Sequence, residues 1–367
     1  MDAHEHTQAR KGIRLRLPLW VRKHKKATIL IAIFMLLASV LIASIITLSH
    51  TNTPRMKVPL TRAAGKKPDP KYYSPLTGLP VADEAATKSN VTAIMIENSP
   101  DARPQSGLQQ ADVVYEAIAE GGITRFAALY QQQRPELIGP VRSLRMYYLD
   151  WVAPYDPSIA HVGGSLYALQ EVRNGSHKDI DQFHNPGTYW RTSDRYAPHN
   201  VYTNFAHLDA LNSQRGYTQS NPQPIARQNT MPPGGAASSV NVTMSSQTYD
   251  SAWQYDAGSK TYLRSQAGAP HTDREAGQIS SQVVVVLKMH MDTVMEDGWR
   301  ENYHTSGTGD AVIFAQGQAH EVTWHKESMR KQMFFTTKSN NKPFELPRGK
   351  TWMTAVPANE GGGVSWQ

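Results

Sequence analysis

The stretch Val91–Glu97, VTAIMIE, marks the point where the chain changes from a proline-rich segment to folded protein. Its apolar and β-branched residues predict a buried strand. Two further β-rich runs follow, Asp112–Glu120 and Ile123–Tyr130, and the pair Gly121-Gly122 between them is typical of a hairpin turn. The folded part is therefore expected to open with the strands of a sheet.

Helices are predicted among the strands that follow. Ser143 is a suitable N-cap for a helix that runs to about Ala153 and stops before Pro154. The strand expected over Ile159–Val162 leads through two glycines and a serine into a second helix. The predicted ranges of that helix and of a third are Leu166–Val172 and Thr203–Leu211. This half of the folded part is expected to mix helices and strands.

Residues 213–238 are rich in Gln, Asn, Pro, Gly and Ser, a composition typical of a linker. Strand patterns dominate after it, at Val240–Met244, Ser251–Asp256, Thr261–Arg264, Gln282–Lys288, Ala311–Ala315, Ala319–Trp324 and Trp352–Val356. We therefore predict an α+β fold after a single transmembrane helix. Its N-terminal mixed α/β domain covers residues 90–212, and its mainly β C-terminal domain covers residues 239–367.

The segment Ala27–Leu48 contains 22 uncharged residues and is apolar on every face. At about 1.5 Å per residue, a helix of this length crosses the ~30 Å hydrocarbon core of a membrane. A cleaved signal peptide would have a shorter apolar run of roughly 7–15 residues, followed by a small-residue cleavage site. We therefore predict an uncleaved signal anchor.

Basic residues flank this segment unequally. The tail over residues 1–26 carries eight Lys or Arg against two acids, so the positive-inside rule places it in the cytoplasm. Residues 49–89 contain six prolines and are expected to form an extended stalk. The prediction is a single-pass protein of the cell membrane whose bulk is extracytoplasmic.

Composition excludes several classes of site and partner. The chain has no cysteine, which rules out disulfides, zinc–thiolate sites, cysteine nucleophiles and a lipidated N-terminal cysteine. Its 38 Lys or Arg and 31 Asp or Glu give a net charge of +7. This excess lies in the tail and in residues 49–89, so residues 90–367 are slightly acidic. That distribution argues against nucleic acid as a partner.

A set of segments distributed over residues 72–356 carries a family resemblance. They are Pro75–Val81 (PLTGLPV), Arg103–Tyr115 (RPQSGLQQADVVY), Glu120–Phe126 (EGGITRF), Gly139–Arg145 (GPVRSLR), His161–Ser165 (HVGGS), Arg195–Tyr202 (RYAPHNVY), Tyr255–Asp256, Tyr262–Arg264, His271–Asp273 and Gly349–Trp352. Together they resemble the YerB-like family of bacterial envelope lipoproteins, a family of unknown function. The resemblance implies an extracytoplasmic protein with an N-terminal α/β part and a C-terminal β part. The chain departs from the family's type protein in having an anchor segment where a lipidated cysteine would be.

Cationic residues and glycines gather around two predicted helix starts and one loop. The residues are Arg142, Arg145, His161, Gly163, Gly164, Ser165, Arg191, Arg195, His199 and Asn200. Backbone N–H groups at a helix N-terminus bind anions, and arginine side chains hold phosphate or carboxylate through paired hydrogen bonds. We expect one anion-binding cleft here, with the two histidines as candidate acid/base groups and the other residues as ligand contacts.

Two functions are compatible with such a cleft. In one, the folded part binds an anionic envelope polymer or an envelope protein, and the lack of a recognisable nucleophile or metal set favours this function. In the other, it is a hydrolase or transferase acting on phosphoester or glycan substrates, with His161 or His199 as general acid or base. A simpler interpretation is that Gly163-Gly164-Ser165 is an ordinary turn and that the arginines form ion pairs.

No cofactor or metal is predicted. His290 and Asp292 lie two residues apart, so they would share one face of a strand, but they lack further ligands in view. Ser328–Lys331 and Lys350-Thr351 resemble motifs of penicillin-binding enzymes. Because Trp352 stands where those enzymes have glycine, we reject that assignment.

Overall fold

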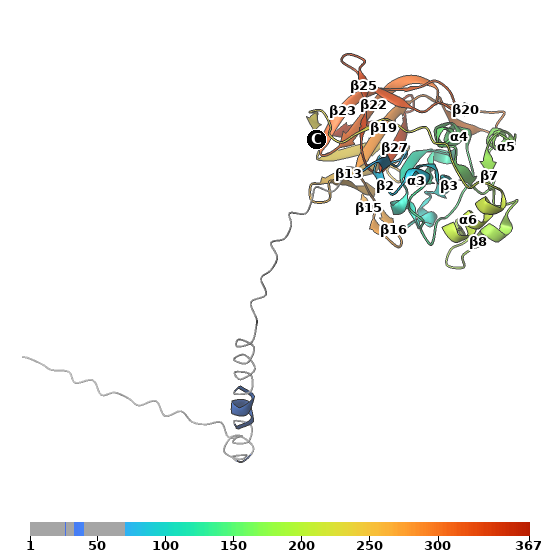
Figure 1. Cartoon of the computed structure of the whole chain (residues 1–367). Coiled ribbons are helices and arrows are strands. Elements are labelled where there is room, and N and C mark those ends of the chain that lie inside the picture. The colour runs from blue at the N-terminus through green and yellow to red at the C-terminus, as the bar shows by residue number, and fades with distance from the viewer. Residues whose placement is uncertain (1–25, 27–32, 40–69) are drawn as a thin grey trace, which may run out of the picture. The chain divides into compact units, whose positions relative to one another are not determined.

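A computed structural model describes residue 26, residues 33–39 and residues 70–367 (Figure 1). Residues 33–39 are helical. The rest of the predicted anchor, almost all of the predicted cytoplasmic tail and the first part of the predicted stalk lie outside the described residues. Within the described residues, no helix is both long enough and apolar enough to cross a membrane.

The folded body begins before residue 90. A hairpin of β1 (Tyr72–Tyr73) and β2 (Pro80–Val81) is followed by the short helix α3 (Glu84–Lys88). Ser74 Oγ accepts two backbone N–H groups within the hairpin turn, and this turn buries Leu76. Residues 70–89 therefore belong to the body and not to an extended stalk, because the prolines that predicted extension shape a packed turn.

A twelve-stranded sheet runs through the whole body. From one edge to the other its strands are β25 (Pro343–Phe344), β24 (Phe334–Thr337), β23 (Gln318–Lys326), β22 (Gly307–Ala315), β19 (Val283–Met289), β27 (Thr351–Pro357), β4 (Val113–Ile118), β5 (Thr124–Tyr130), β3 (Thr92–Glu97), β6 (Ser158–Ala160) and β7 (Lys178–Asp179), while β11 (Gly235–Ala236) pairs with β23. Strand β27 is parallel to both β19 and β4. A strand from near the C-terminus therefore joins the two halves of the chain at the middle of the sheet.

A six-stranded sheet contains β15 (Ala269–Pro270), β14 (Thr261–Gln266), β13 (Ser251–Asp256), β12 (Ser239–Thr243) and β28 (Gly363–Trp366), with β18 (Ser280–Ser281) paired to β14. The remaining two-stranded pairs are β8 (Trp190–Arg191) with β9 (Val201–Tyr202), β10 (Arg227–Gln228) with β26 (Leu346–Pro347), β16 (Thr272–Asp273) with β17 (Gly277–Gln278), and β20 (Met291–Val294) with β21 (Arg300–Tyr303). The prediction that strands dominate after residue 239 is confirmed.

The segment predicted as a linker, residues 213–238, is tied into the body. Strand β10 pairs in parallel with β26, and β11 pairs with the edge of β23. Arg227, in β10, also donates hydrogen bonds to the backbone oxygens of Leu76 and Pro347. The α/β part and the β part of the chain therefore share one sheet, and the segment between them forms part of the same body.

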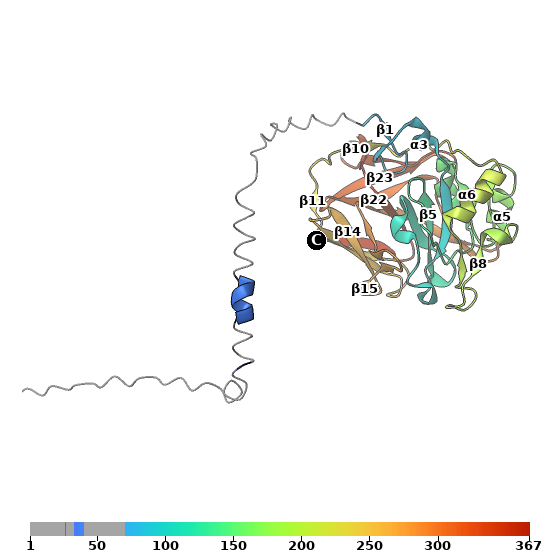
Figure 2. The same cartoon turned by 60° about the horizontal axis from the view of Figure 1, so that its bottom comes forward.

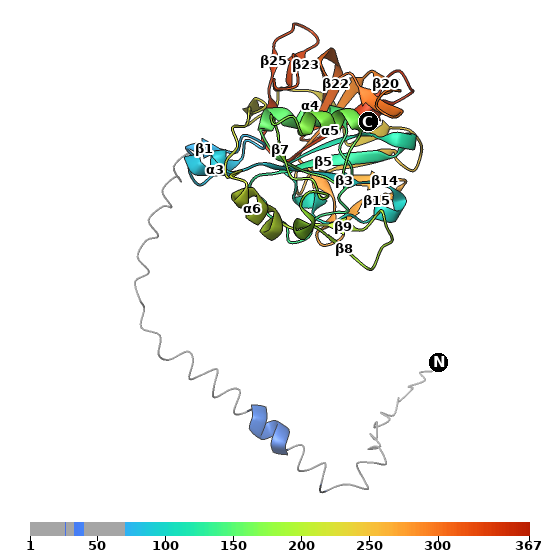
Figure 3. The ribbon, with the colours of Figure 1, turned by 90° about the vertical axis from the view of Figure 1, so that its right-hand side faces the viewer.

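Helices cover both faces of the large sheet. Helices α4 (Met146–Val152) and α5 (Leu166–Val172) run along one face, whereas α6 (Phe205–Gln214) and the six-stranded sheet lie on the other (Figure 3). Short 3₁₀ turns occur at Pro100–Ala102, Leu108–Gln110, Glu120–Gly122, Ala153–Tyr155 and Pro186–Thr188. The range predicted for α5 is confirmed. Helix α4 starts later than predicted, with Arg145 and not Ser143 at its N-cap, because Leu144 bridges to Gly164 and keeps this segment extended.

Aromatic side chains on alternate strand positions fill the two layers of the core. On the helical face, Tyr115 of β4 stacks on Trp151 of α4, with ring centroids 5.6 Å apart. On the opposite face, Trp352 of β27 meets Phe126 of β5 edge to face at 5.2 Å and Trp253 of β13 at 5.4 Å. Since successive strand residues point to opposite faces, the sequence period sets which layer each ring enters.

A fully buried ion pair joins the two halves of the body. Glu116 of β4 and Arg264 of β14 are both 0% exposed, and the guanidinium donates to both carboxylate oxygens at 2.8 and 2.9 Å. Trp352 Nε1 and Thr354 Oγ1, both on β27, donate to the same carboxylate at 2.9 and 3.3 Å. The guanidinium also lies 4.8 Å from the ring centroid of Trp352. Three segments distant in sequence thus contribute to one buried charge pair, in which only Arg264 Nε has no hydrogen-bond partner among the described residues.

The ion pair continues into a chain of hydrogen bonds. Arg264 donates to His271 Nδ1, and His271 Nε2 donates to Gln105 Oε1 at 2.8 Å. Burial and the neighbouring guanidinium lower the pKa of His271 well below its usual value, so this imidazole is neutral. Gln105 Nε2 donates in turn to the backbone oxygen of Glu97 at 3.0 Å. The end of β3 is therefore positioned by the C-terminal half of the chain.

A second basic side chain, Lys350, is partly buried directly before β27. Its Nζ donates to the backbone oxygen of Gln109 and to Gln109 Oε1. Gln109 is held in turn by Ser280 and Asp273 of the C-terminal half. Burial lowers the pKa of Lys350 to about 7, against the opposing effect of nearby acids. The folded protein therefore holds this amine neutral above about pH 7.

Breaking the buried ion pair on one side should strongly destabilise the body. Glu116→Leu or Arg264→Met alone leaves a buried charge without a partner, so each should lower the free energy of unfolding of residues 70–367 by about 3–5 kcal/mol. The double variant should lose much less than the sum of the two. Urea denaturation of the four proteins measures the coupling, and additive losses would show that the pair is not a unit.

Lys350 predicts a specific dependence of stability on pH. Its folded pKa of about 7 lies below the unfolded value of about 10.4. In that interval the unfolded chain holds the extra proton, so stability contributed by this group rises with pH from about 7 to 10, by up to about 1.4 kcal/mol per pH unit. Lys350→Met should remove this rise, whereas Lys342→Met, which removes an exposed ammonium, should not. Parallel pH profiles of wild type and Lys350→Met would contradict the assignment.

Candidate functional site

The ends of β3 and β6 lie side by side, because the two strands are parallel neighbours. The extended segment before α4 runs across these ends. The backbone N–H of Arg142 donates to the carbonyl of Met95 at 2.8 Å, and its carbonyl accepts from the N–H of Val162 at 3.1 Å. Arg142 is therefore fixed where two parallel strands end, a place where sheets commonly present binding residues.

An open hollow of about 610 Å³ lies beside Arg142. It is lined by Arg142, Ser143, Val162, Gly163, Gly164, Leu169, Arg173, Phe183, His184 and Arg191. Three of these residues are arginines and none is acidic. Phe183 is 66% exposed. The hollow thus combines positive charge with one accessible aromatic ring.

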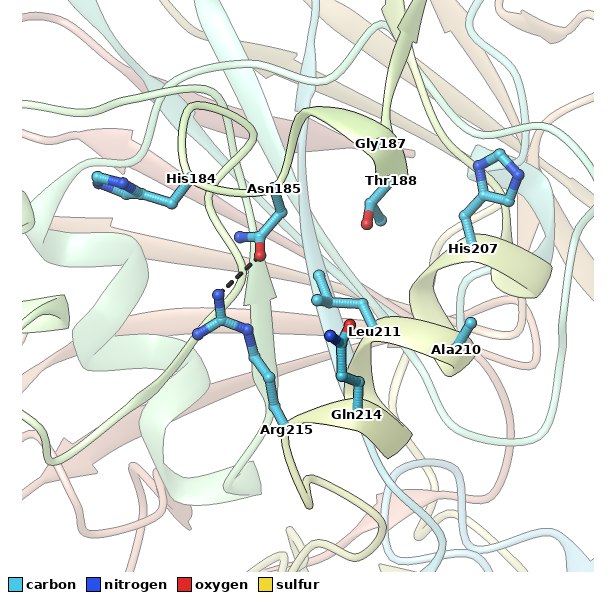
Figure 4. Close-up of a pocket in the computed structure, with 9 residues that line it drawn as sticks. All are labelled: His184, Asn185, Gly187, Thr188, His207, Ala210, Leu211, Gln214 and Arg215. Atoms are coloured by element: carbon cyan, nitrogen blue, oxygen red, sulfur yellow. Dashed lines mark hydrogen bonds between the residues drawn. The ribbon is translucent and has the colours of Figure 1, made fainter.

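A neighbouring hollow of about 660 Å³ lies between the loop after β7 and helix α6 (Figure 4). Its lining residues are His184, Asn185, Gly187, Thr188, His207, Ala210, Leu211, Gln214 and Arg215. Figure 4 shows Asn185 and Thr188 projecting from the loop toward α6, where Arg215 donates to Asn185 Oδ1 at 2.7 Å. His184 lines both hollows, so the two adjoin. The elements that contribute lining residues, among them α5, α6 and β8, lie together at one end of the body (Figure 2).

Arg142 and His199 share one buried carboxylate. Glu97, the last residue of β3, is 4% exposed, and its Oε1 lies 3.4 Å from Arg142 Nε and 2.9 Å from His199 Nδ1. Ser99 Oγ donates to the same oxygen at 3.0 Å. The Arg142 and His199 side chains remain 27% and 22% exposed. A buried carboxyl group therefore positions an arginine and a histidine that solvent can still reach.

Arg191 enters the hollow from β8 and has a neutral partner. Its guanidinium donates to Asn200 Oδ1 at 2.7 Å. Asn200 Nδ2 donates to the backbone oxygens of Thr192 and Arg195, both at 3.1 Å, which fixes the loop. Arg173 differs, since it pairs with the buried Asp181 at 2.7 Å. The charge of Arg191 is therefore less compensated than that of Arg173.

Two of the expected ligand arginines are committed to other partners. Arg145 forms a two-point ion pair with Glu120 through Nε and the terminal nitrogen, and its side chain is 7% exposed. Burial opposes ionisation of Glu120, but the hydrogen bonds from Arg145 lower the pKa of that carboxyl to about 2. Arg195 donates to the backbone oxygens of Ala102 and Pro104. Both arginines hold the framework together and line neither hollow.

His161 is 0% exposed, and both of its ring nitrogens are engaged. Nδ1 lies 2.8 Å from the carbonyl oxygen of Gly163, and Nε2 lies 3.0 Å from Asp179 Oδ1. An acid/base group must reach its substrate. His161 is therefore not placed to act as the expected acid/base group, because it is buried. Its contact with Asp179 instead links the end of β6 to β7.

Carboxyl groups of the chain itself accept hydrogen bonds from backbone N–H groups at the start of α5. Gly163, at φ +60, donates its N–H to Asp181 Oδ1 at 3.0 Å, and the N–H of Tyr167 donates to Asp297 Oδ1 at 2.7 Å. Ser165 is buried, and its Oγ has no hydrogen-bond partner among the described residues. The N–H groups expected to bind an external anion are thus met by carboxylates of the chain, one of them from the β20–β21 hairpin.

The structure brings together only part of the predicted cleft. Arg142, Gly163, Gly164 and Arg191 line one hollow, and His199 and Asn200 contact its arginines or their partner. The residues contributed by the loop after β7 and by α6 were not among the predicted site residues; they are Phe183, His184, Asn185, His207 and Arg215. The turn pattern Asn185-Pro186-Gly187 was the available signal for that loop.

The Glu97–His199 pair lacks the geometry of a nucleophilic triad. In such a triad, the carboxylate and the serine contact different ring nitrogens of the histidine. Here Ser99 Oγ lies 3.1 Å from Nδ1, the nitrogen that also meets Glu97. Ser99 is therefore a further hydrogen-bonding partner of the carboxylate. The arrangement is suited to holding charge and not to activating Ser99.

Comparison with known proteins gives consistent matches over the body. Residues 76–218 match the model described as "Protein of unknown function (DUF3048) N-terminal domain", and residues 240–353 match the corresponding C-terminal domain. The chain is 32% identical over 304 residues to "Putative lipoprotein YerB" of Bacillus subtilis (strain 168), covering 80% of this chain and 89% of that protein. The crystal structure of the YerB protein from Bacillus subtilis superposes with a TM-score of 0.72 at 30% identity, covering 80% of this chain and all of that one.

Proposed function

The chain belongs to the DUF3048 family, and from that premise we propose that it is a membrane-anchored envelope protein that binds an anionic ligand. The proposed ligand site is the hollow lined by Arg142, Arg173 and Arg191. The observation that carries the proposal is the presence of three arginines and no acid among the residues that line it.

The electrostatics of the hollow support an anion. The Arg142 side chain makes one ion-pair contact, at 3.4 Å, and no hydrogen bond within residues 70–367. Arg191 faces an amide, so its positive charge is not cancelled. Guanidinium groups of this kind bind phosphate or carboxylate by charge-assisted hydrogen bonds.

The shape of the site favours an extended ligand. The adjoining hollows share His184, and the second adds Arg215 and His207 without any acid among its lining residues. Phe183 offers a ring that can pack on an apolar or sugar face. A phosphate- or carboxylate-bearing envelope polymer fits this arrangement better than a single small ion.

Binding is better supported than hydrolysis. His161 is buried, and His199 shares its carboxylate with a serine on the same ring nitrogen. An envelope hydrolase or transferase that uses His199 would need a nucleophile or a water molecule activated by this histidine. The arrangement of Glu97, Ser99 and His199 activates neither the serine nor a site for such a water. We therefore assign His199 a positioning role: it contacts Glu97, the carboxyl group that also lies beside Arg142.

The proposed attachment differs from the one that the name of the Bacillus relative, "Putative lipoprotein YerB", implies for that protein. A lipoprotein anchor needs a cysteine, and this chain has none. The 22-residue uncharged segment Ala27–Leu48 supplies another means of attachment, with the basic tail on the cytoplasmic side. Under this proposal, residues 70–367 work outside the membrane.

Loss of the partly exposed Arg142 or of the exposed Arg191 should weaken anion binding. Arg142→Ala and Arg191→Ala should each reduce affinity for a glycerol phosphate oligomer by about tenfold to a hundredfold, because a hydrogen bond to a charged group contributes about 1.5–3 kcal/mol. Added salt should weaken wild-type binding. Isothermal titration measures both effects.

Lys342→Ala serves as the control, since it removes one positive charge from the turn between β24 and β25. This variant should bind the oligomer with unchanged affinity. Uncharged polyglycerol, in contrast, should show no measurable binding to the wild type. Equal affinity of wild type and the Arg142→Ala, Arg191→Ala double variant would contradict the proposed site.

Topology can be measured separately from ligand binding. Protease added to intact cells should remove residues 70–367 and leave a short membrane-bound fragment, because the basic tail and the uncharged segment favour an N-in, C-out arrangement. A cytoplasmic protein of the same cells must survive the treatment as a control for lysis. Protection of the body until the cells are broken would reverse the proposed orientation.

A further inference from the structure

The β20–β21 hairpin places three potential metal ligands on one face. Its register pairs Met291 with Tyr303 and Asp292 with Asn302. The backbone N–H of His304 donates to the carbonyl of His290 at 2.9 Å, so these two histidines form the next pair of the ladder. Because side chains alternate along a strand, His290, Asp292 and His304 all point to the same side of the hairpin.

The side chains converge on one point. His290 Nε2 lies 2.9 Å from Asp292 Oδ1, and His304 Nε2 lies 2.6 Å from Asp292 Oδ2. The two imidazole ring centroids are 4.7 Å apart. One ligand atom from each residue lies within 4.8 Å of the others. The three side chains are about half exposed, so an ion in solution can reach them.

The base of the hairpin is anchored in the body. Tyr303, on the opposite face from the histidines, is 1% exposed and meets the ring of Tyr147 at 5.2 Å. Asn359 clamps the other strand, since it accepts from the N–H of Met291 and donates to its carbonyl, both at 2.8 Å. The backbone that carries the two histidines is therefore fixed before any ion binds.

We infer that His290, Asp292 and His304 form a binding site for a divalent transition-metal ion of the Zn²⁺ type. Two imidazole nitrogens and one carboxylate oxygen are a ligand set that such ions prefer, while Ca²⁺ and Mg²⁺ prefer oxygen alone. Three protein ligands leave at least one coordination position for water or for a group of another molecule. The site is independent of the arginine-lined hollow.

Zn²⁺ titration of the full chain in detergent tests the site. The tail histidines are removed from every sample as His4→Ala, His6→Ala and His24→Ala, so that they cannot contribute. One Zn²⁺ should bind per chain. Loss of an outer-shell partner alone typically costs about 10–100-fold in metal affinity, so His290→Ala or His304→Ala should weaken binding by at least that much. Absence of Zn²⁺ binding by the parent chain, or equal binding by these variants, would overturn the inference.

A gain of affinity provides a test that misfolding cannot mimic. Asn302 lies directly opposite Asp292, on the same face as the ligands. Asn302→His should supply a fourth ligand and tighten Zn²⁺ binding by about tenfold or more. Thr293→His adds the same side chain one residue along β20, on the opposite face, and should leave affinity unchanged. If both substitutions tighten binding equally, the three residues do not define a site.

Discussion

The buried ion pair of Glu116 and Arg264 constrains the whole body. A carboxylate and a guanidinium removed from water must be fully paired, and here the pairing requires β4, β14 and β27 together. The two regions matched by the family models supply different parts of this arrangement: Glu116 comes from the first and Arg264 from the second. The regions are distinct in sequence and secondary structure, yet neither can satisfy its buried charge without the other.

The same dependence reaches the candidate ligand site. Arg264 orders His271, His271 orders Gln105, and Gln105 holds the backbone at the end of β3, where Glu97 positions Arg142 and His199. The arginines of the body therefore fall into two groups with different surroundings. Those that are nearly buried, such as Arg145, brace carboxylates or carbonyl groups. Arg142, which is partly exposed, and Arg191, which is exposed, keep donors available to solvent.

Local pattern was sufficient for the elements and insufficient for the contacts between them. The apolar run at Val91–Glu97 and the glycines before Leu166 predicted β3 and α5, because burial and turn chemistry act over a few residues. The Pro-rich segment 70–89 was mistaken for a stalk because prolines shape packed turns as well as extended chain. The start of α5 was expected to hold an external anion, whereas Asp297, 130 positions away, occupies it. The sequence likewise did not predict His304 as a partner of His290, because only the register of the β20–β21 hairpin brings the two residues together.

The central position of β27 has a consequence for the order in which the body can assemble. Thr354 and Glu116 touch across 238 positions of sequence, and until β27 arrives, β4 presents an unpaired edge. A ribosome delivers the N-terminal end first, so the middle of the sheet cannot close until Thr351–Pro357 has been synthesised. Contacts of such long range slow folding. The sheet of a nascent chain therefore remains incomplete, and its unpaired strands remain open to chaperones, until β27 has left the ribosome.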